Sequence, residues 1–287
     1  MSPSWTILQL IRWTAARFQR EGLPGPRLEA EILLAQALGK GRVDLYIHFD
    51  QPLQPEELAR FKTLIQRRLR REPLAYIIGR KEFWSLEFEV TPDVLIPRPE
   101  TETLVAQALE VLSSKEHPWR ILEIGTGSGA VAVALAREFP SAAVSATDLS
   151  PAALRLAGEN ARRNQVHERI EFLAGNLFRP VGGRTFDLIV TNPPYIPRGQ
   201  LSSLPPEIRD YEPRLALDGG EDGLDFFRRA LPQAGRYLLR GSWFLAEIGC
   251  GQEEAVRQIA GRQPDLDSLS FAPDLSGIQR VFRARKK

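Results

Sequence analysis

The residues ILEIGTGSGAVAVALA, 121–136, join a short apolar strand to an apolar helix through a glycine-rich turn. Gly125, Gly127 and Gly129, with Thr126 and Ser128 between them, allow the backbone to turn tightly and to approach a ligand at the N-terminus of the helix. The spacing G-x-G-x-G differs from the G-x-G-x-x-G of dinucleotide-binding folds, which counts against a nicotinamide cofactor. The stretch predicts a strand, a ligand-binding loop and a helix in succession.

Apolar strands alternate with helices from Arg120 onward, a pattern typical of a mostly parallel, doubly wound α/β sheet. Strands are expected at 120–124, 142–148, 169–176, 186–192 and 242–249, and helices at 129–139, 151–164, 223–239 and 252–262. Two final strands, 267–274 and 278–285, have no helix between them and predict an antiparallel hairpin at the edge of the sheet.

The N-terminal part of the chain has a different pattern. Apolar residues recur at intervals of three and four in 5–22, 26–41 and 54–72, and glycine or proline marks the ends of these segments. Residues 1–80 are therefore expected to form a small all-helical domain. Residues 81–98 alternate polar and apolar side chains and predict a β-hairpin linker with its turn at 91–93. Residues 99–287 then form the ligand-binding domain, which begins with a helix in 98–114.

Composition excludes several classes of protein. Lys and Arg number 38 against 36 Asp and Glu, so the net charge of +2 gives no argument for nucleic-acid or membrane binding. One cysteine and three scattered histidines predict neither a disulfide framework nor a metal site. No apolar stretch is long enough to span a membrane and no signal peptide is visible, so a cytoplasmic location is expected.

Polar residues are expected at the carboxyl ends of the next two strands, the edge where ligands bind in such sheets. Asp148 ends the second strand, where a carboxylate can accept the hydroxyl protons of a ribose. Its alternative role is an N-cap, for which Ser150 is better suited. Asn176 and Leu177 follow the third strand and are candidates to bracket an adenine by a hydrogen bond and an apolar contact.

The fourth strand runs into Asn192, Pro193, Pro194 and Tyr195. Each proline fixes φ and removes an N–H group, so this segment predicts a stiff turn that offers carbonyl acceptors and few donors. A plain β-turn is the alternative, which the glycine loop upstream disfavours.

Together, LEIGTGSG (122–129), Asp148 and NPPY (192–195) resemble the class I S-adenosylmethionine-dependent methyltransferases that act on planar nitrogens. The resemblance implies a Rossmann-like catalytic domain that binds S-adenosyl-L-methionine through 125–129, Asp148, Asn176, Leu177 and Asn192, and releases S-adenosyl-L-homocysteine. It also implies that the Asn192 side-chain carbonyl and the Pro193 backbone carbonyl accept the two N–H groups of the target. Pro194 and Tyr195 then complete the substrate side, with Tyr195 against the planar group. Orientation and carbonyl dipoles supply the catalysis.

The segments LIPRPETE (95–102), NPPYIP (192–197), YEPRLALDGGEDGLDFFRR (211–229) and GIQRVFRAR (277–285) further resemble the PrmC/HemK family. Its members methylate N5 of a glutamine in peptide chain release factors. The resemblance implies that both domains grip the release factor, that the glutamine of its Gly-Gly-Gln loop enters the pocket, and that no nucleic acid or membrane is required. A monomer is expected. Where relatives often carry an acidic and an aromatic residue after the third strand, this chain has Asn176 and Leu177.

Several interpretations stay open at this point. Phe83, with Trp84, is either a wall of the substrate pocket or part of the hairpin core. Arg98 and Glu100 are a possible ion pair, and an ordinary helix cap is the alternative. Arg67, Arg68, Arg70 and Arg71 are interpreted as a solvated helix end, with a docking surface for protein or RNA as the alternative. Glu247 is interpreted as a structural carboxylate at a strand end.

Two other functions remain possible from the residues alone. One is methylation of another acceptor, either a ribosomal protein glutamine or a DNA or RNA base. The missing strongly basic groove disfavours the DNA or RNA base. The other is a noncatalytic nucleotide-binding module, which the intact Asn-Pro-Pro-Tyr motif disfavours.

Overall fold

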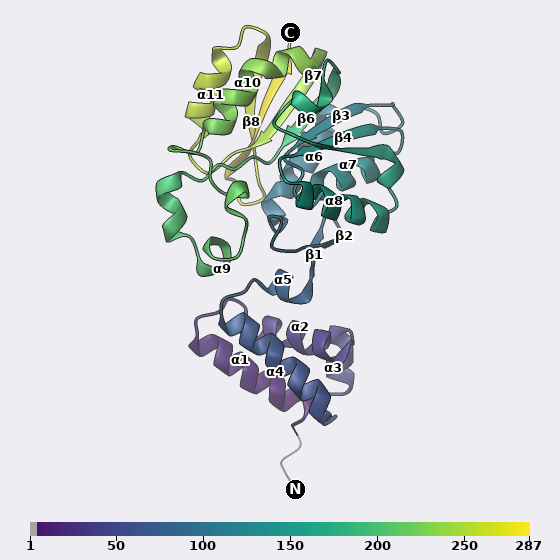
Figure 1. Cartoon of the computed structure of the whole chain (residues 1–287), viewed down its shortest axis with the longest axis vertical. Helices are drawn as coiled ribbons and strands as arrows, with labels where there is room; N and C mark the ends of the chain where they lie inside the picture. Colours follow the sequence, from purple (N-terminus) through teal and green to yellow (C-terminus); the bar gives the residue numbers. More distant parts are fainter. Residues whose placement is uncertain (1–4) are drawn as a thin grey trace. The chain divides into compact units, whose positions relative to one another are not determined.

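The computed structural model describes residues 5–287, which form two compact units (Figure 1). The first unit comprises the described residues up to Gly79 together with Pro206–Tyr211, and the second comprises Arg80–Pro205 and Glu212–Lys287. Residues 81–98, which the sequence predicts as a separate linker, therefore belong to the second unit.

The first unit is helical, as the fold class predicts. Its helices are α1 (Ile7–Arg20), α2 (Pro26–Leu38), α3 (Arg42–Ile47), α4 (Pro55–Leu69), α5 (Leu74–Ile78) and α9 (Pro206–Arg209). Local chemistry sets the helix ends: Thr6 and Gln9 form a capping box at the start of α1, and Gly39 ends α2 in the left-handed region. Fully buried apolar side chains from α1, α2 and α4, Phe18, Leu33 and Phe61 among them, fill one core.

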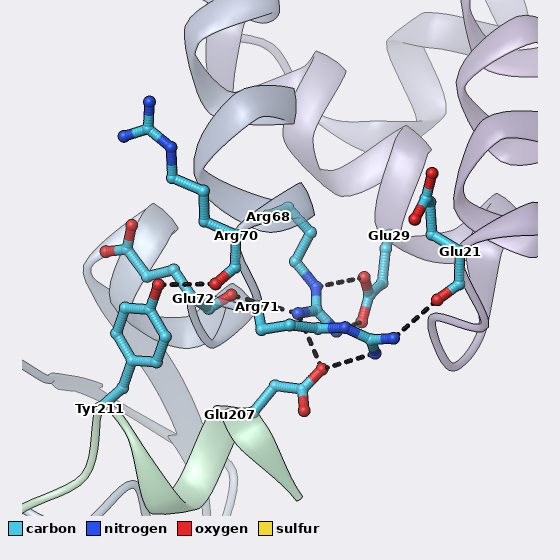
Figure 2. Close-up of polar contacts among 8 residues, drawn as sticks. All are labelled: Glu21, Glu29, Arg68, Arg70, Arg71, Glu72, Glu207 and Tyr211. Carbon is cyan, nitrogen blue, oxygen red and sulfur yellow. Dashed lines mark hydrogen bonds and ion pairs between the residues drawn. The ribbon is translucent and has the colours of Figure 1, made fainter.

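Three of the four arginines at the end of α4, Arg67, Arg68 and Arg71, are paired with acids of the same unit, so the interpretation as a solvated helix end is wrong for them and holds only for the exposed Arg70 side chain (Figure 2). Arg68 is only 2% exposed, and its Nε and Nη2 donate to the two carboxylate oxygens of Glu29 at 2.7 and 3.3 Å. Arg68 Nη1 and Arg71 Nη1 both donate to Glu207 Oε1, at 3.1 and 3.2 Å. Glu207 lies 139 residues after Arg68, too far along the chain for a local pattern to predict the pair.

The segment Pro206–Tyr211 has a third hydrogen bond to the same helix end, from Tyr211. The Tyr211 hydroxyl donates to the Arg70 backbone carbonyl at 2.7 Å (Figure 2). Arg67 is held within the helix end itself, where it forms a bidentate pair with Glu72. Hydrogen bonds of Glu207 and Tyr211, near the two ends of the short segment, therefore hold it against the C-terminal end of α4 and the residues just beyond it.

The second unit opens with a hairpin of β1 (Arg80–Phe83) and β2 (Leu86–Glu89). Its turn is at Trp84 and Ser85, both with positive φ as in a type I′ turn, and not at 91–93 as predicted. Neither glycine nor asparagine, the residues that usually mark such a turn, occupies these two positions. The unusual backbone is compensated by hydrogen bonds from the Trp84 backbone N–H to Glu102 at 2.7 Å and from its indole N–H to Glu138 at 2.9 Å.

A seven-stranded sheet in the order β5-β4-β3-β6-β7-β9-β8 forms the centre of the second unit. Its strands are β3 (Arg120–Ile124), β4 (Ala143–Asp148), β5 (Ile170–Ala174), β6 (Phe186–Thr191), β7 (Leu238–Glu247), β8 (Leu266–Pro273) and β9 (Gln279–Lys286). The pairs from β5 to β7 are parallel, and β9 pairs antiparallel with both β7 and β8. This confirms the predicted doubly wound sheet with its C-terminal antiparallel hairpin.

Helices cover both faces of this sheet (Figure 1). The helices in this unit are α6 (Glu102–Val111), α7 (Ala130–Glu138), α8 (Pro151–Arg163), α10 (Asp225–Tyr237) and α11 (Glu253–Gly261). Residues of α6, α7 and α8 share a core with Ile121 of β3, whereas residues of α10 and α11 share a core with Leu122 and Ile124. The alternation of side chains along β3 thus separates two cores, one on each face.

The strand register brings four polar or flexible positions to one edge. Ile124 of β3 pairs with Thr147 of β4 and with Thr191 of β6, and Thr191 pairs with Ala246 of β7. The residues that directly follow these four paired positions lie next to one another at the carboxyl edge of the sheet. They are Gly125, Asp148, Asn192 and Glu247. This edge includes the point where β3 has β4 on one side and β6 on the other, the usual ligand position in such sheets.

Candidate active site

A cavity of about 300 Å³ opens at this carboxyl edge, and every residue that lines it belongs to the second unit. Ten of the thirteen predicted cofactor- and substrate-binding residues lie in its wall: Gly125, Thr126, Gly127, Ser128, Asp148, Asn176, Leu177, Asn192, Pro193 and Pro194. Three others, Gly129, Tyr195 and Phe83, are not among the lining residues. The size falls at the lower end of the range for small-molecule sites.

Glycine is required in this loop for two different structural reasons. Gly125 and Gly127 have φ of +74° and +55°, and a Cβ at either position would meet no atom within 4 Å. Since both line the cavity, they leave bare backbone facing open space, which fits a ligand lying along the loop. Gly129 instead allows close packing, because a Cβ there would lie 3.0 Å from the Ala157 Cβ of α8.

Asp148 retains acceptor capacity for a ligand. Its Oδ2 accepts from the Gly127 N–H at 2.9 Å and its Oδ1 from the Ser150 N–H at 2.8 Å. Each carboxylate oxygen has a further lone pair, so the group can also accept hydroxyl protons. Ser150 is the N-cap of α8, where its hydroxyl accepts from the Ala153 N–H at 3.2 Å.

Asn176 and Leu177 lie side by side in the cavity wall, after β5. The Asn176 side-chain carbonyl accepts a hydrogen bond from Arg229 of α10 at 2.8 Å. This contact leaves the Asn176 amide N–H₂ as the available group, a donor suited to a ring nitrogen. Asn176 can therefore donate a hydrogen bond to a ligand, which a carboxylate at this position could not.

Glu123 lies beneath the glycine loop at 2% exposure. Its Oε2 accepts from the Thr126 hydroxyl at 2.5 Å and from the Ala132 N–H at 3.1 Å. Burial raises the pKa of this carboxyl to about 8, and the nearby Asp148 contributes in the same direction. Burial therefore favours the protonated form of this carboxyl group at the floor of the cavity.

The Asn192 side chain is fixed by a chain of hydrogen bonds that the sequence did not predict. Its Nδ2 donates to the Thr101 hydroxyl at 2.9 Å, and that hydroxyl donates to Glu247 Oε2 at 2.7 Å. Among residues 5–287, no donor hydrogen-bonds to Asn192 Oδ1 or to the Pro193 carbonyl. Two carbonyl oxygens beside the cavity are thus left as acceptors.

Tyr195 has a different position from the one expected. Its hydroxyl donates to Glu247 Oε1 at 3.2 Å and its backbone carbonyl accepts from Gln252 at 3.0 Å. Burial and the neighbouring Glu247 raise the pKa of this phenol. In this structure Tyr195 therefore supports the turn from behind and does not line the cavity.

The predictions for Phe83 and Arg98 also differ from the structure. Phe83 is 1% exposed and packs edge-on against Phe88 in the core, so its side chain cannot wall a substrate pocket. The hairpin-core interpretation is the correct one. Arg98 does line the cavity, but it pairs with the buried Glu212 at 2.5 Å and not with Glu100.

The role of two glycines in the segment 218–223, Gly219 and Gly223, was not predictable from the sequence. A Cβ at Gly219 would lie 2.8 Å from the Tyr195 Cα, and one at Gly223 would clash with the Tyr195 carbonyl oxygen. These glycines let the segment pack directly on the backbone of the Asn-Pro-Pro-Tyr turn. Glycine clusters in loops are common, and only the three-dimensional contact reveals what these ones touch.

The described residues contain neither a metal-binding cluster nor a membrane-spanning helix. No group of three or more His, Cys, Asp and Glu side chains in 5–287 could hold a metal ion. Within the same residues, none of the helices has the length and hydropathy needed to cross a membrane.

Two family models match the chain: the PrmC N-terminal domain over residues 9–79 and the methyltransferase small domain over residues 102–203. The release factor glutamine methyltransferase of Geobacter sulfurreducens is 48% identical over 281 residues, which are 98% of this chain and 97% of the relative. That of Moorella thermoacetica is 43% identical over 282 residues, 98% of this chain and 99% of the relative. A methyltransferase structure from Pyrococcus furiosus, 19% identical, shares the fold with a TM-score of 0.53 over 72% of this chain and 91% of that one.

Fold, cavity and comparisons together define a class I methyltransferase. The sequence match to the curated relatives identifies the protein more narrowly than the fold does, because it includes both units. The chain belongs to the release factor glutamine methyltransferase family.

Proposed function

We propose that this protein transfers a methyl group from S-adenosyl-L-methionine to N5 of the glutamine in the Gly-Gly-Gln motif of a peptide chain release factor. The observation that carries the proposal is the pair of unpaired acceptors beside the cavity, Asn192 Oδ1 and the Pro193 carbonyl. A primary carboxamide presents two N–H donors, which match these two acceptors in number and polarity.

The cofactor fits the opposite part of the cavity wall. We assign its amino-acid and ribose portions to the open backbone of 125–129 and to Asp148, and its adenine to Asn176 and Leu177. Asn192 lies where the cofactor and substrate portions of the cavity meet. When bound, S-adenosylmethionine supplies a methyl group on a sulfonium sulfur and leaves as S-adenosyl-L-homocysteine.

The residues of the turn act by orientation. The lone pair of an amide nitrogen is delocalised, so the nitrogen is a weak nucleophile that must be held in line. Asn192 and Pro193 hold both N–H groups, and their carbonyl dipoles stabilise the positive charge that develops on the nitrogen. Pro193 and Pro194 have no N–H, so the turn offers no competing donor from these positions.

We further propose that the protein acts as a monomer in the cytoplasm and without nucleic acid. The proposed roles use only residues of the second unit, so the proposal requires no residue from a second copy. Size-exclusion chromatography with light scattering tests the monomer, and methylation of a nuclease-treated release factor tests the independence from nucleic acid.

The enzyme side of the proposal is tested with Asn192→Ala. Loss of one preorganised acceptor is expected to lower kcat for methylation of a purified release factor about 100- to 1000-fold. Asn164→Ala is the matched control, because Asn164 caps α8 through hydrogen bonds to Glu87 and Asn160 and does not line the cavity. Equal rates for the wild type and Asn192→Ala would refute the role of the motif.

A further inference from the structure

Glu247 holds both ends of the Asn-Pro-Pro-Tyr turn. One carboxylate oxygen accepts from the Thr101 hydroxyl, which in turn accepts from Asn192, and the other accepts from the Tyr195 hydroxyl. Glu247 is 1% exposed and Thr101 is 5% exposed, so both groups are largely shielded from bulk water. The four side chains come from three places: Glu247 from β7, Thr101 from the 3-10 turn Pro99–Thr101, and Asn192 and Tyr195 from the turn after β6.

The polarity of this chain of hydrogen bonds follows from the chemistry of its members. An ionised carboxylate only accepts, so the Thr101 hydroxyl proton must point to Glu247. The Thr101 oxygen is then left with lone pairs only, and it can bind Asn192 only through the amide N–H₂. The carbonyl oxygen of Asn192 is therefore on the other side, where no protein donor among residues 5–287 reaches it.

The sheet register explains why these residues meet. Thr191 pairs with Ala246, so Asn192 and Glu247 follow on adjacent parallel strands, β6 and β7. Thr101 precedes α6, whose residues Leu104 and Val105 pack in the core on one face of the sheet. The hydroxyl is thereby brought between the amide and the carboxylate.

We propose that Thr101 and Glu247 are positioning residues that set the orientation of the Asn192 amide, so that its carbonyl oxygen and not its N–H₂ faces the substrate nitrogen. Without the Thr101 hydroxyl the amide is free to rotate. Its flipped form presents N–H groups to the N–H groups of the substrate, which is repulsive. The catalytic consequence rests on the proposed function, whereas the orientation itself does not.

The test compares Thr101→Val, which has nearly the same shape without the hydroxyl, with Thr101→Ser, which keeps the hydroxyl. We expect Thr101→Val to lower kcat about 10- to 100-fold with KM for the release factor changed less than about threefold, since orientation and not binding is lost. Thr101→Ser is expected to retain kcat within about threefold. The melting temperatures of both variants are measured as well. If Thr101 had only a structural role, two variants with equal melting temperatures would also have equal kcat.

A second measurement needs no substrate. Side-chain amide signals in an asparagine-labelled NMR spectrum are recorded for each variant, and Asn192→Ala identifies the Asn192 signal. Slow hydrogen exchange of one Asn192 amide proton in the wild type and Thr101→Ser, with fast exchange in Thr101→Val, supports the inference. Unchanged exchange together with unchanged kcat in Thr101→Val overturns it. A wild type that methylates no release factor contradicts the proposed function alone, because the exchange measurement still decides the orientation.

Discussion

Glu123 is a carboxyl group whose pKa is raised from 4.5 to about 8 by burial beneath the glycine loop. The folded chain therefore binds this proton more tightly than the unfolded chain. The resulting stabilisation is complete below pH 4.5 and is lost as the pH rises through about 8. The loss between these limits is on the order of 5 kcal/mol, at about 1.4 kcal/mol for each pH unit.

Glu123→Gln should remove this dependence. The amide oxygen can still accept from Thr126 and Ala132, but the side chain no longer titrates. Urea unfolding of both proteins at pH 5.5 and pH 8.5 checks the prediction, because the other groups titrate equally in the two proteins. The wild type should lose more stability than the variant at the higher pH, and identical losses would show that Glu123 does not titrate in this range.

The position of individual residues at the cavity was predictable where their neighbours in sequence indicate it. The glycine loop, Asp148 and Asn192 were visible because their neighbours in sequence explain them. The contact of Thr101 with Glu247 joins residues 146 positions apart and depends on the register of β6 with β7. No local pattern carries that information, so the sequence alone predicts no more than a structural carboxylate at Glu247.

At the scale of elements, the contact between the segment 218–223 and the Asn-Pro-Pro-Tyr turn gives a sharp test. Gly223 and Gly251 have nearly the same φ, +82° and +79°, but only a Cβ at Gly223 would clash with the Tyr195 carbonyl, whereas one at Gly251 would meet open space. Gly223→Ala is expected to cost more than about 2 kcal/mol and to lower methyl transfer, since Tyr195 must move. Gly251→Ala should cost about 1 kcal/mol from φ alone.

Thermal unfolding and initial rates of the two alanine variants check this difference. Equal effects on stability and rate would mean that the close approach to Tyr195 has no consequence.

The segment Pro206–Tyr211 offers a second test at this scale. Burial alone would raise the pKa of Glu207, but hydrogen bonds from its own backbone, Arg68 and Arg71 lower it. Glu207→Ala should therefore cost about 1–3 kcal/mol at pH 7 and expose the segment to trypsin at Arg209. Because the lowered pKa stabilises only the ionised form, this cost should diminish as the pH falls below 4.5, toward the lowered pKa.

Limited proteolysis and thermal unfolding measure these effects. Glu116→Ala is the control, since Glu116 is an exposed residue of a loop in the second unit. Cleavage of Glu207→Ala at the rate of the control would show that the ion pairs do not hold the segment.

Elements were predictable to the extent that they follow hydrophobic periodicity. The alternation of strands and helices gave the sheet, and the missing helix before the last strand gave its antiparallel hairpin. The turn of the first hairpin was placed incorrectly, because Trp84 and Ser85 adopt positive φ without any of the usual turn residues. Tertiary hydrogen bonds from Trp84 to Glu102 and Glu138 hold that backbone, and they are absent from local sequence.

At the scale of the whole molecule, the chain is divided between a helical unit and an α/β unit that contains the complete cavity. The division differs from the predicted one at two places. The hairpin joins the α/β unit because Phe83 and Phe88 are part of its core, and Pro206–Tyr211 joins the helical unit through Glu207 and Tyr211. Long-range burial and charge pairing cause both differences.

The most direct test of the central claim is transfer of labelled methyl from S-adenosylmethionine to a purified release factor, with the modified residue located by mass spectrometry. We predict label on the glutamine of the intact Gly-Gly-Gln motif, and none when that glutamine is changed to alanine. Parallel reactions contain ribosomal proteins, RNA or DNA in place of the release factor. Label on one of these, with the release factor unlabelled, would contradict the proposed substrate while leaving a methyltransferase.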